Sequence, residues 1–142
     1  MVKLLVPFDG SENAQRALRY AIMLAQKFGP VSIHVVSAHE EPDIYGEIAV
    51  YVTREKMAEL QRAASEALLE RADQILKDSG VAYTREILTG NIAQVIARHA
   101  DELGCDGIVM GSRGMAALGN LMMGSVATKV VHFAQVPVTI VK

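Results

Sequence analysis

Residues 2–37 read VKLLVPFDGSENAQRALRYAIMLAQKFGPVSIHVVS, and this stretch predicts a strand, a helix and a second strand. The runs at 2–8 and 31–37 are short, apolar and rich in Val, which is typical of strands buried on both faces of a parallel sheet. Between these two runs lies a helical pattern, which ends at Gly29-Pro30. Its regularly spaced apolar residues are Ala14, Ala17, Leu18, Ala21, Ala25 and Phe28. Such a unit favours a parallel α/β fold.

The alternation of strand and helix continues along the rest of the chain. Further apolar runs of strand length lie at 82–88, 107–110 and 138–141. We therefore expect a three-layer α/β/α sandwich, formed by a single domain over residues 1–142, with parallel strands joined by right-handed crossovers. In open sheets of this kind, ligands bind beyond the carboxyl ends of the strands.

Helical patterns separate these later strands. The helix expected at 53–79 has a predicted apolar stripe of Leu60, Ala64, Ala67, Leu68, Ala72, Ile75 and Leu76. Asn91 and Gln94 have the spacing of a capping box, and the helix that follows them carries Ile92, Val95, Ile96, Ala100 and Leu103. The last helix is expected at 125–134, with inward-facing Ala127, Val130, Val131 and Ala134.

The composition indicates a compact protein without disulfides or metal centres. The 142 residues include 14 Lys+Arg and 16 Asp+Glu, which gives a formal charge of −2. Cys105 has no other cysteine to pair with, so we interpret it as a small buried apolar residue in a reducing compartment. The four His residues show no metal-ligand spacing and are interpreted as structural or surface residues, at positions 34, 39, 99 and 132.

The sequence also disfavours a membrane or a nucleic acid as a partner. The apolar stretch before Asp9 is too short for a signal peptide, and no run approaches 18 apolar residues. The chain has no block of Lys and Arg, which phosphate-backbone binding requires. We expect a cytoplasmic protein.

A glycine-rich segment follows the fourth predicted strand. Residues 111–125 read GSRGMAALGNLMMGS and lead into the last predicted helix. Glycines can adopt left-handed backbone geometry and let the backbone come close to a ligand. A turn of this kind can therefore point several N–H groups at an anion. The positive end of the helix adds to that attraction. The junction is suited to phosphate, and its length favours a triphosphate.

Two common nucleotide signatures do not fit. Gly119 and Gly124 have the glycine spacing of a P-loop, but Ser125 stands in the Lys position and Val126 replaces the hydroxyl that binds magnesium. The first strand is followed by Gly10 alone, without the glycine pattern of a dinucleotide-binding turn. NAD and FAD are therefore disfavoured.

The glycines do match the pattern G-x-x-G, nine residues, G-[ST], at Gly111, Gly114 and Gly124-Ser125. Together with LLVPFDGS at 4–11, IVMGSRG at 108–114 and PVTIV at 137–141, this pattern resembles the ATP-binding branch of the universal stress protein family. The resemblance implies a five-stranded parallel sheet of order 3-2-1-4-5, as in the adenine nucleotide alpha hydrolase-like fold. It also implies ATP at the ends of strands one and four, and a homodimer.

The resemblance further implies which residues bind the nucleotide. Gly111, Arg113, Gly114, Gly124, Ser125 and Val126 would contact phosphate and ribose, Pro7 and Asp9 would line the nucleoside end, Val36, Ser37 and Ala38 would flank the base, and Met110 belongs to the same set. A Mg²⁺ or Mn²⁺ ion would be held mainly by the phosphates. Asp9 has an alternative role as a helix cap or turn anchor, and Arg113 has one as a surface cation.

The expected function is that of a dimeric stress-response regulator that binds ATP and acts through partner proteins the sequence does not identify. No dedicated apparatus for phosphoryl transfer is visible, although Ser112 and Ser125 near bound phosphates would be slow acceptors. Two alternatives stay open: a slow ATPase or autophosphorylating enzyme, and an interaction module that binds no nucleotide. The dimer is expected to pair through the predicted C-terminal edge strand, Val138, Thr139, Ile140 and Val141.

Overall fold

The computed structural model describes residues 1–41, 53–113 and 123–142. Its sheet has five strands in the order β3-β2-β1-β4-β5, and every neighbouring pair is parallel. The strands are β1 (Val2–Pro7), β2 (Val31–His39), β3 (Tyr83–Thr89), β4 (Gly107–Gly111) and β5 (Val138–Val141). The predicted strand order is confirmed.

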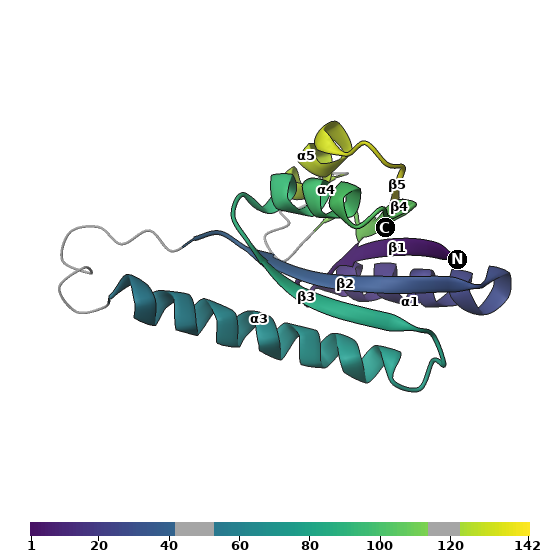
Figure 1. Cartoon of the computed structure of the whole chain (residues 1–142), viewed down its shortest axis with the longest axis horizontal. Helices are drawn as coiled ribbons and strands as arrows, with labels where there is room; N and C mark the ends of the chain where they lie inside the picture. The colour runs from purple at the N-terminus through teal and green to yellow at the C-terminus, as the bar shows by residue number, and fades with distance from the viewer. Residues whose placement is uncertain (42–52, 114–122) are drawn as a thin grey trace.

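Helices cover both faces of this sheet, as the predicted sandwich requires. The described helices are α1 (Glu12–Phe28), α3 (Arg54–Leu76), α4 (Ile92–Glu102) and α5 (Ser125–Phe133). Figure 1 shows α1 and α3 on one side of the strands and α4 and α5 on the other.

Each face of the sheet has its own apolar core, because side chains alternate along a strand. Ile33 and Val35 of β2 pack with Leu18 of α1 and Leu69 of α3. Val36, next along the same strand, packs on the opposite face with residues of α4 and α5, Ile96 and Val130 among them. Strands β1, β2 and β4 are thus buried on both faces, which explains their continuous apolar sequence.

The inward face of α3 agrees with the predicted stripe at Leu68, Ala72, Ile75 and Leu76 and differs from it at the other positions. Its buried residues are Ser65, Leu69, Ala72 and Leu76, whereas Leu60 is 52% exposed and Ala64 and Ala67 are exposed. The helix packs along β2 and β3 at the edge of the sheet. Its buried residues at i, i+4, i+7 and i+11 belong to the core, and the partly buried Leu68 and Ile75 pack against it. Phe28 and Val131, also assigned to inward stripes, are 73% and 48% exposed.

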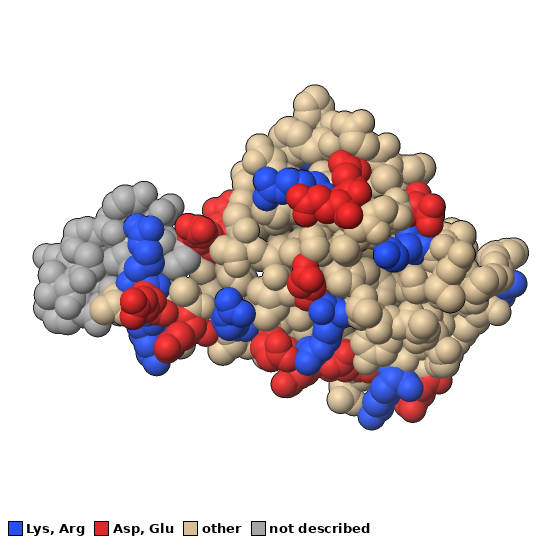
Figure 2. Space-filling model, in the orientation of Figure 1, with Lys and Arg blue, Asp and Glu red and all other residues tan. Residues whose placement is uncertain are grey.

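No described helix combines the length and apolarity needed to cross a membrane. Figure 2 shows Lys and Arg side chains interspersed with Asp and Glu side chains over α3 and α4. On this face of the molecule the two signs of charge are mixed rather than segregated.

The first turn of α1 approaches the end of β4 very closely. A Cβ atom added at Gly111 would lie 2.8 Å from the backbone carbonyl carbon of Asn13 and 2.8 Å from its Cβ. Real Cβ atoms do not come so near to backbone atoms, so any larger residue at 111 would push the helix away. Glycine at this position is explained by helix packing.

The corrected face of α3 can be tested by two substitutions in the same helix. Leu69→Ala should lower the free energy of unfolding by about 2–5 kcal/mol, because a buried leucine leaves a cavity. Leu60→Ala, at an exposed site, should change it by less than about 0.5 kcal/mol. Urea denaturation of both variants measures the difference, and equal effects would contradict the assignment of the two faces.

The close approach at Gly111 predicts a further difference between two glycines of β4. Gly111→Ala should destabilise the protein by about 1–3 kcal/mol through overpacking against Asn13. Gly107→Ala should stay within about 1 kcal/mol of the parent, since its Cβ would meet its nearest neighbours at 3.4 and 3.5 Å. Thermal unfolding provides the comparison, and a Gly111→Ala variant as stable as the parent would rule out this role of the glycine.

Candidate functional site

Strands β1 and β4 lie side by side at the centre of the sheet, and their carboxyl ends form the candidate site. The chain leaves β1 toward β2 on one side, while β4 pairs on the other. This divergence is the topological switch point, where open α/β sheets bind ligands. Asp9 and Ser11 follow β1, and Ser112 and Arg113 follow β4, so polar residues meet at this edge.

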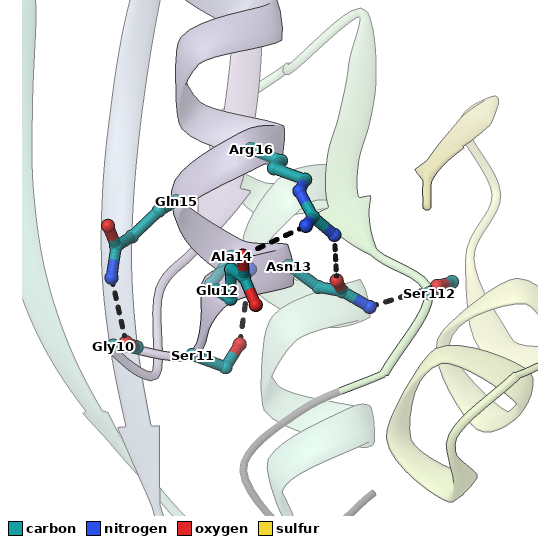
Figure 3. Close-up of polar contacts among 8 residues, drawn as sticks. All are labelled: Gly10, Ser11, Glu12, Asn13, Ala14, Gln15, Arg16 and Ser112. Atoms are coloured by element: carbon teal, nitrogen blue, oxygen red, sulfur yellow. Dashed lines mark hydrogen bonds and ion pairs between the residues drawn. The ribbon is translucent and has the colours of Figure 1, made fainter. Parts of the chain in front are cut away.

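The turn after β1 is built by the exposed Asp9. Its Oδ1 accepts a hydrogen bond of 2.9 Å from the backbone N–H of Ser11, and Gly10 between them has a φ of +79°. The hydroxyl of Ser11 then accepts from the N–H of Ala14 and caps α1 (Figure 3). The proposed turn-anchoring role of Asp9 is therefore present.

A hydrogen-bonded chain of side chains joins α1 to the end of β4. The Nδ2 of Asn13 donates to the hydroxyl of Ser112 at 3.2 Å, and Arg16 donates to the Oδ1 of Asn13 at 2.9 Å. Arg16 also pairs with Glu12 on the surface of the helix (Figure 3). Ser112 is only 3% exposed, so its hydroxyl is a structural group and is not accessible as a phosphate acceptor.

Two backbone N–H groups of the predicted phosphate-binding segment donate hydrogen bonds within the protein instead. The N–H of Ser112 donates to the carbonyl of Val141 at 2.8 Å, and the N–H of Gly124 donates to the carbonyl of Ser112 at 2.6 Å. Neither Gly111 nor Gly124 has a positive φ, so the predicted left-handed geometry is wrong for these two glycines. Gly114 and Gly119 lie outside the described residues.

The beginning of α5 differs from the beginnings of the other described helices. Side chains of Ser11, Thr53 and Asn91 cap α1, α3 and α4; the last of these confirms the predicted cap. The N-cap of α5 is Gly124, with no side-chain cap hydrogen bond. Among the described residues, no capping side chain bonds the first-turn amides of α5, whose partial positive charge attracts anions.

The remaining predicted residues divide between core and surface. Val36, Ser37 and Met110 are 0%, 2% and 5% exposed, so their side chains form the interior behind the site. Pro7, Ala38, Arg113 and Val126 are partly exposed, and Ser125 is exposed. Of the three residues predicted from the end of β2, Ala38 is thus the one whose side chain reaches solvent.

Several residues of this region gave no signal in the sequence. Asn13 and Arg16 are polar residues in the first turns of an amphipathic helix, where such residues are usually solvated. Their contacts with each other and with Ser112 depend on the packing of α1 against β4. Cys105, by contrast, is buried as predicted, and burial raises the pKa of its thiol.

Comparisons with known proteins assign the chain to a family. The profile of the universal stress protein family matches residues 1–142. A universal stress protein of Thermus aquaticus is 37% identical, with 98% of this chain and 97% of the relative aligned. The family implied by the sequence motifs is confirmed.

Solved structures agree. MJ0577 of Methanocaldococcus jannaschii superposes with a TM-score of 0.84 and 26% identity, covering 99% of this chain and 94% of the other. The universal stress protein of Archaeoglobus fulgidus, solved in complex with dAMP, gives a TM-score of 0.68, 27% identity and coverage of 100% and 98%. Family members solved with cAMP and with AMP share the fold at 23% and 20% identity. This chain belongs to the universal stress protein family.

Proposed function

We propose that this protein binds ATP at the carboxyl ends of β1 and β4 and acts as a dimeric regulator of the stress response. The observation that carries the proposal is the uncapped beginning of α5, held at the end of β4 by the bond from Gly124 N–H to Ser112. A fixed helix N-terminus without a side-chain cap is a favourable site for phosphate. The complex of a relative with dAMP supports an adenine nucleotide as the ligand class.

The phosphate end of the ligand would lie at the start of α5. The N–H groups of Ser125 and Val126 are in the first turn, where the helix dipole favours an anion. The hydroxyl of the exposed Ser125 adds a donor. Gly111, Arg113 and Gly114 belong to the same end in this proposal.

The nucleoside end would lie over the turn after β1. Asp9 is exposed there, and a carboxylate accepts hydrogen bonds from ribose hydroxyls or an adenine amino group. Pro7 at the end of β1 and Ala38 near the end of β2 offer partly exposed apolar surface. Val36, Ser37 and Met110 would support this surface from within the core rather than touch the base.

In this proposal the protein hydrolyses ATP slowly or not at all. Phosphoryl transfer needs a positioned nucleophile and charge neutralisation, and the hydroxyl of Ser112 is buried and bonded to Asn13. A Mg²⁺ or Mn²⁺ ion carried by the phosphates would offset their charge against a chain of net charge −2. The output would be made in the cytoplasm through protein partners that recognise the liganded dimer.

The dimer would form through β5, the edge strand of the sheet. Its free side presents backbone N–H and C=O groups that can pair with the same strand of a second copy. Three of its four residues, Val138, Ile140 and Val141, are partly buried within one chain. Pairing would cover the rest of their apolar surface.

Ligand binding can be tested with Gly124→Val. The φ and ψ of Gly124, −74° and 166°, are open to any residue, so the backbone accepts valine while the new side chain covers the first-turn amides. We expect at least about a tenfold loss of ATP affinity, equivalent to about 1.4 kcal/mol, measured by calorimetry. Val131→Ala, at an exposed site on the same helix, is the matched control and should bind as the parent does.

Unchanged ATP affinity in Gly124→Val would contradict the phosphate site. An intact protein that binds no ATP, and releases no adenine nucleotide on heat denaturation, would favour the interaction module. Magnesium-dependent phosphate release that disappears in Gly124→Val would favour the slow ATPase instead.

Asp9→Ala separates the two roles of this carboxylate. If it bonds the nucleoside, ATP affinity should fall by about 1–3 kcal/mol; Asp78→Ala, at an exposed site after α3, should leave affinity unchanged. The bond from Ser11 N–H to Asp9 is also lost, so the unfolding temperature should fall slightly. A lower unfolding temperature with full ATP affinity would restrict Asp9 to its turn.

A further inference from the structure

Three side chains that commonly bind metals converge on the face of the sheet covered by α4. They are His34 of β2, Glu86 of β3 and His99 of α4, and the ligand atoms they offer all lie within 4.8 Å of one another. No sequence motif indicates this cluster, since its members are far apart in the chain and lack any metal-ligand spacing.

The strand register accounts for the convergence. His34 is paired with Thr84, and Val36 with Glu86. Residues 84 and 86 point to the same face of β3 because side chains alternate along a strand. Helix α4 packs over that face and brings His99 above the pair.

The separation of the two histidine nitrogens fits a tetrahedral ion, whereas the carboxylate of Glu86 would have to move. The Nε2 atoms of His34 and His99 are 3.3 Å apart. Two nitrogens bound to tetrahedral zinc at the usual bond length are about 3.3–3.4 Å apart. The Oε2 of Glu86 lies 2.6 Å from the same nitrogen of His99, and this side chain is 46% exposed, so it can move outward to the ligand position.

When both histidines are neutral, a single hydrogen bond at His99 Nε2 cannot join all three groups. The Nε2 of a neutral His99 carries either a proton or a lone pair. It can donate to Glu86 or accept from His34, but it cannot do both at once. A metal cation accepts a lone pair from each of the two histidine nitrogens and from the carboxylate oxygen of Glu86, so all three would have the same partner.

The surroundings of His34 have the form of an outer shell around a metal ligand. Its Nδ1 lies 2.5 Å from the hydroxyl of Thr84. Donation of the Nδ1 proton to that hydroxyl leaves the lone pair on Nε2, directed at His99. Metal-binding histidines are usually oriented in this way by a partner on the other ring nitrogen.

The cluster is also accessible to solvent, and Glu86 supplies a negative charge beside the two histidines. His34 is 8% exposed, whereas Glu86 is exposed and His99 lines a groove between β3 and α4, so solvent reaches the cluster from the side of these two residues. His99 lies in the last turn of α4, where carbonyl groups favour a cation. Arg98 pairs with Glu102, and Lys3 donates to the carbonyl of Leu103, although the charge of Lys3 still acts on His34.

We propose that His34, Glu86 and His99 form a binding site for one Zn²⁺ ion per chain, with a fourth position open to water. Two imidazoles and one carboxylate select zinc and similar transition metals over Mg²⁺ and Ca²⁺, which prefer oxygen ligands. The ion would tie α4 to β2 and β3. This site is separate from the metal that would accompany ATP and does not depend on the proposed function.

Metal titration of the nucleotide-free protein tests the proposal. Chelator-treated protein should bind Zn²⁺ with a stoichiometry near one in calorimetry, and should bind Co²⁺ with the intense visible absorption of a tetrahedral site. Zn²⁺ should raise the unfolding temperature by several degrees, since it binds the folded state. Mg²⁺ should do neither. Absence of saturable binding at 100-fold excess of Zn²⁺ over protein would overturn the site.

Variants assign the ligands. His99→Ala and Glu86→Gln should weaken Zn²⁺ binding by at least about 10- to 100-fold, the loss expected when even an outer-shell partner is removed. His132→Ala, at an exposed position on α5, is the matched control and should bind normally. If His99→Ala does not fold, Glu86→Gln, which keeps the size of the side chain, decides the result. Unchanged affinity in Glu86→Gln, or equal losses in His132→Ala, would contradict the proposal.

Discussion

The arrangement around the candidate site depends on Ser112, the first residue after β4. Its N–H donates to the carbonyl of Val141 in β5, its carbonyl accepts from Gly124 before α5, and its hydroxyl accepts from Asn13 in α1. All of its polar groups are thus paired, as its burial demands. Ser112 therefore holds β5, α5 and α1 in place relative to the end of β4. Gly111, next to it, allows α1 to pack directly on the strand. The position of the α5 N-terminus at the end of β4 follows from these contacts.

The sequence was sufficient for the architecture because the strands and helices have strong periodic patterns. Continuous apolar runs in β1, β2 and β4 reflect burial on both faces, and Asn91 caps α4 as its spacing indicates. The face of α3 could not be read in the same way. Alanines such as Ala64 fit an apolar stripe yet are tolerated on an exposed helix surface, while the buried Ser65 bonds His39. Tertiary packing decided that face.

Long-range contacts explain what the sequence could not predict at the two sites. Glycine at 111 has the position expected of a phosphate-binding residue, but its close neighbour is the backbone of Asn13. His34, Glu86 and His99 meet only through strand register and the packing of α4. The proposed nucleotide site lies at the strand ends, whereas this cluster lies under α4, so a metal there would act on the stability of one layer without occupying the nucleotide site.

The central claim is that the beginning of α5 receives the phosphates of an adenine nucleotide. Amide chemical shifts of isotope-labelled protein during an ATP titration test this claim most directly. The account predicts that Ser125 and Val126 show the largest saturable shifts, and that Asn91 and Gln94 at the capped start of α4 do not move. Saturable binding that leaves Ser125 and Val126 unperturbed would contradict it.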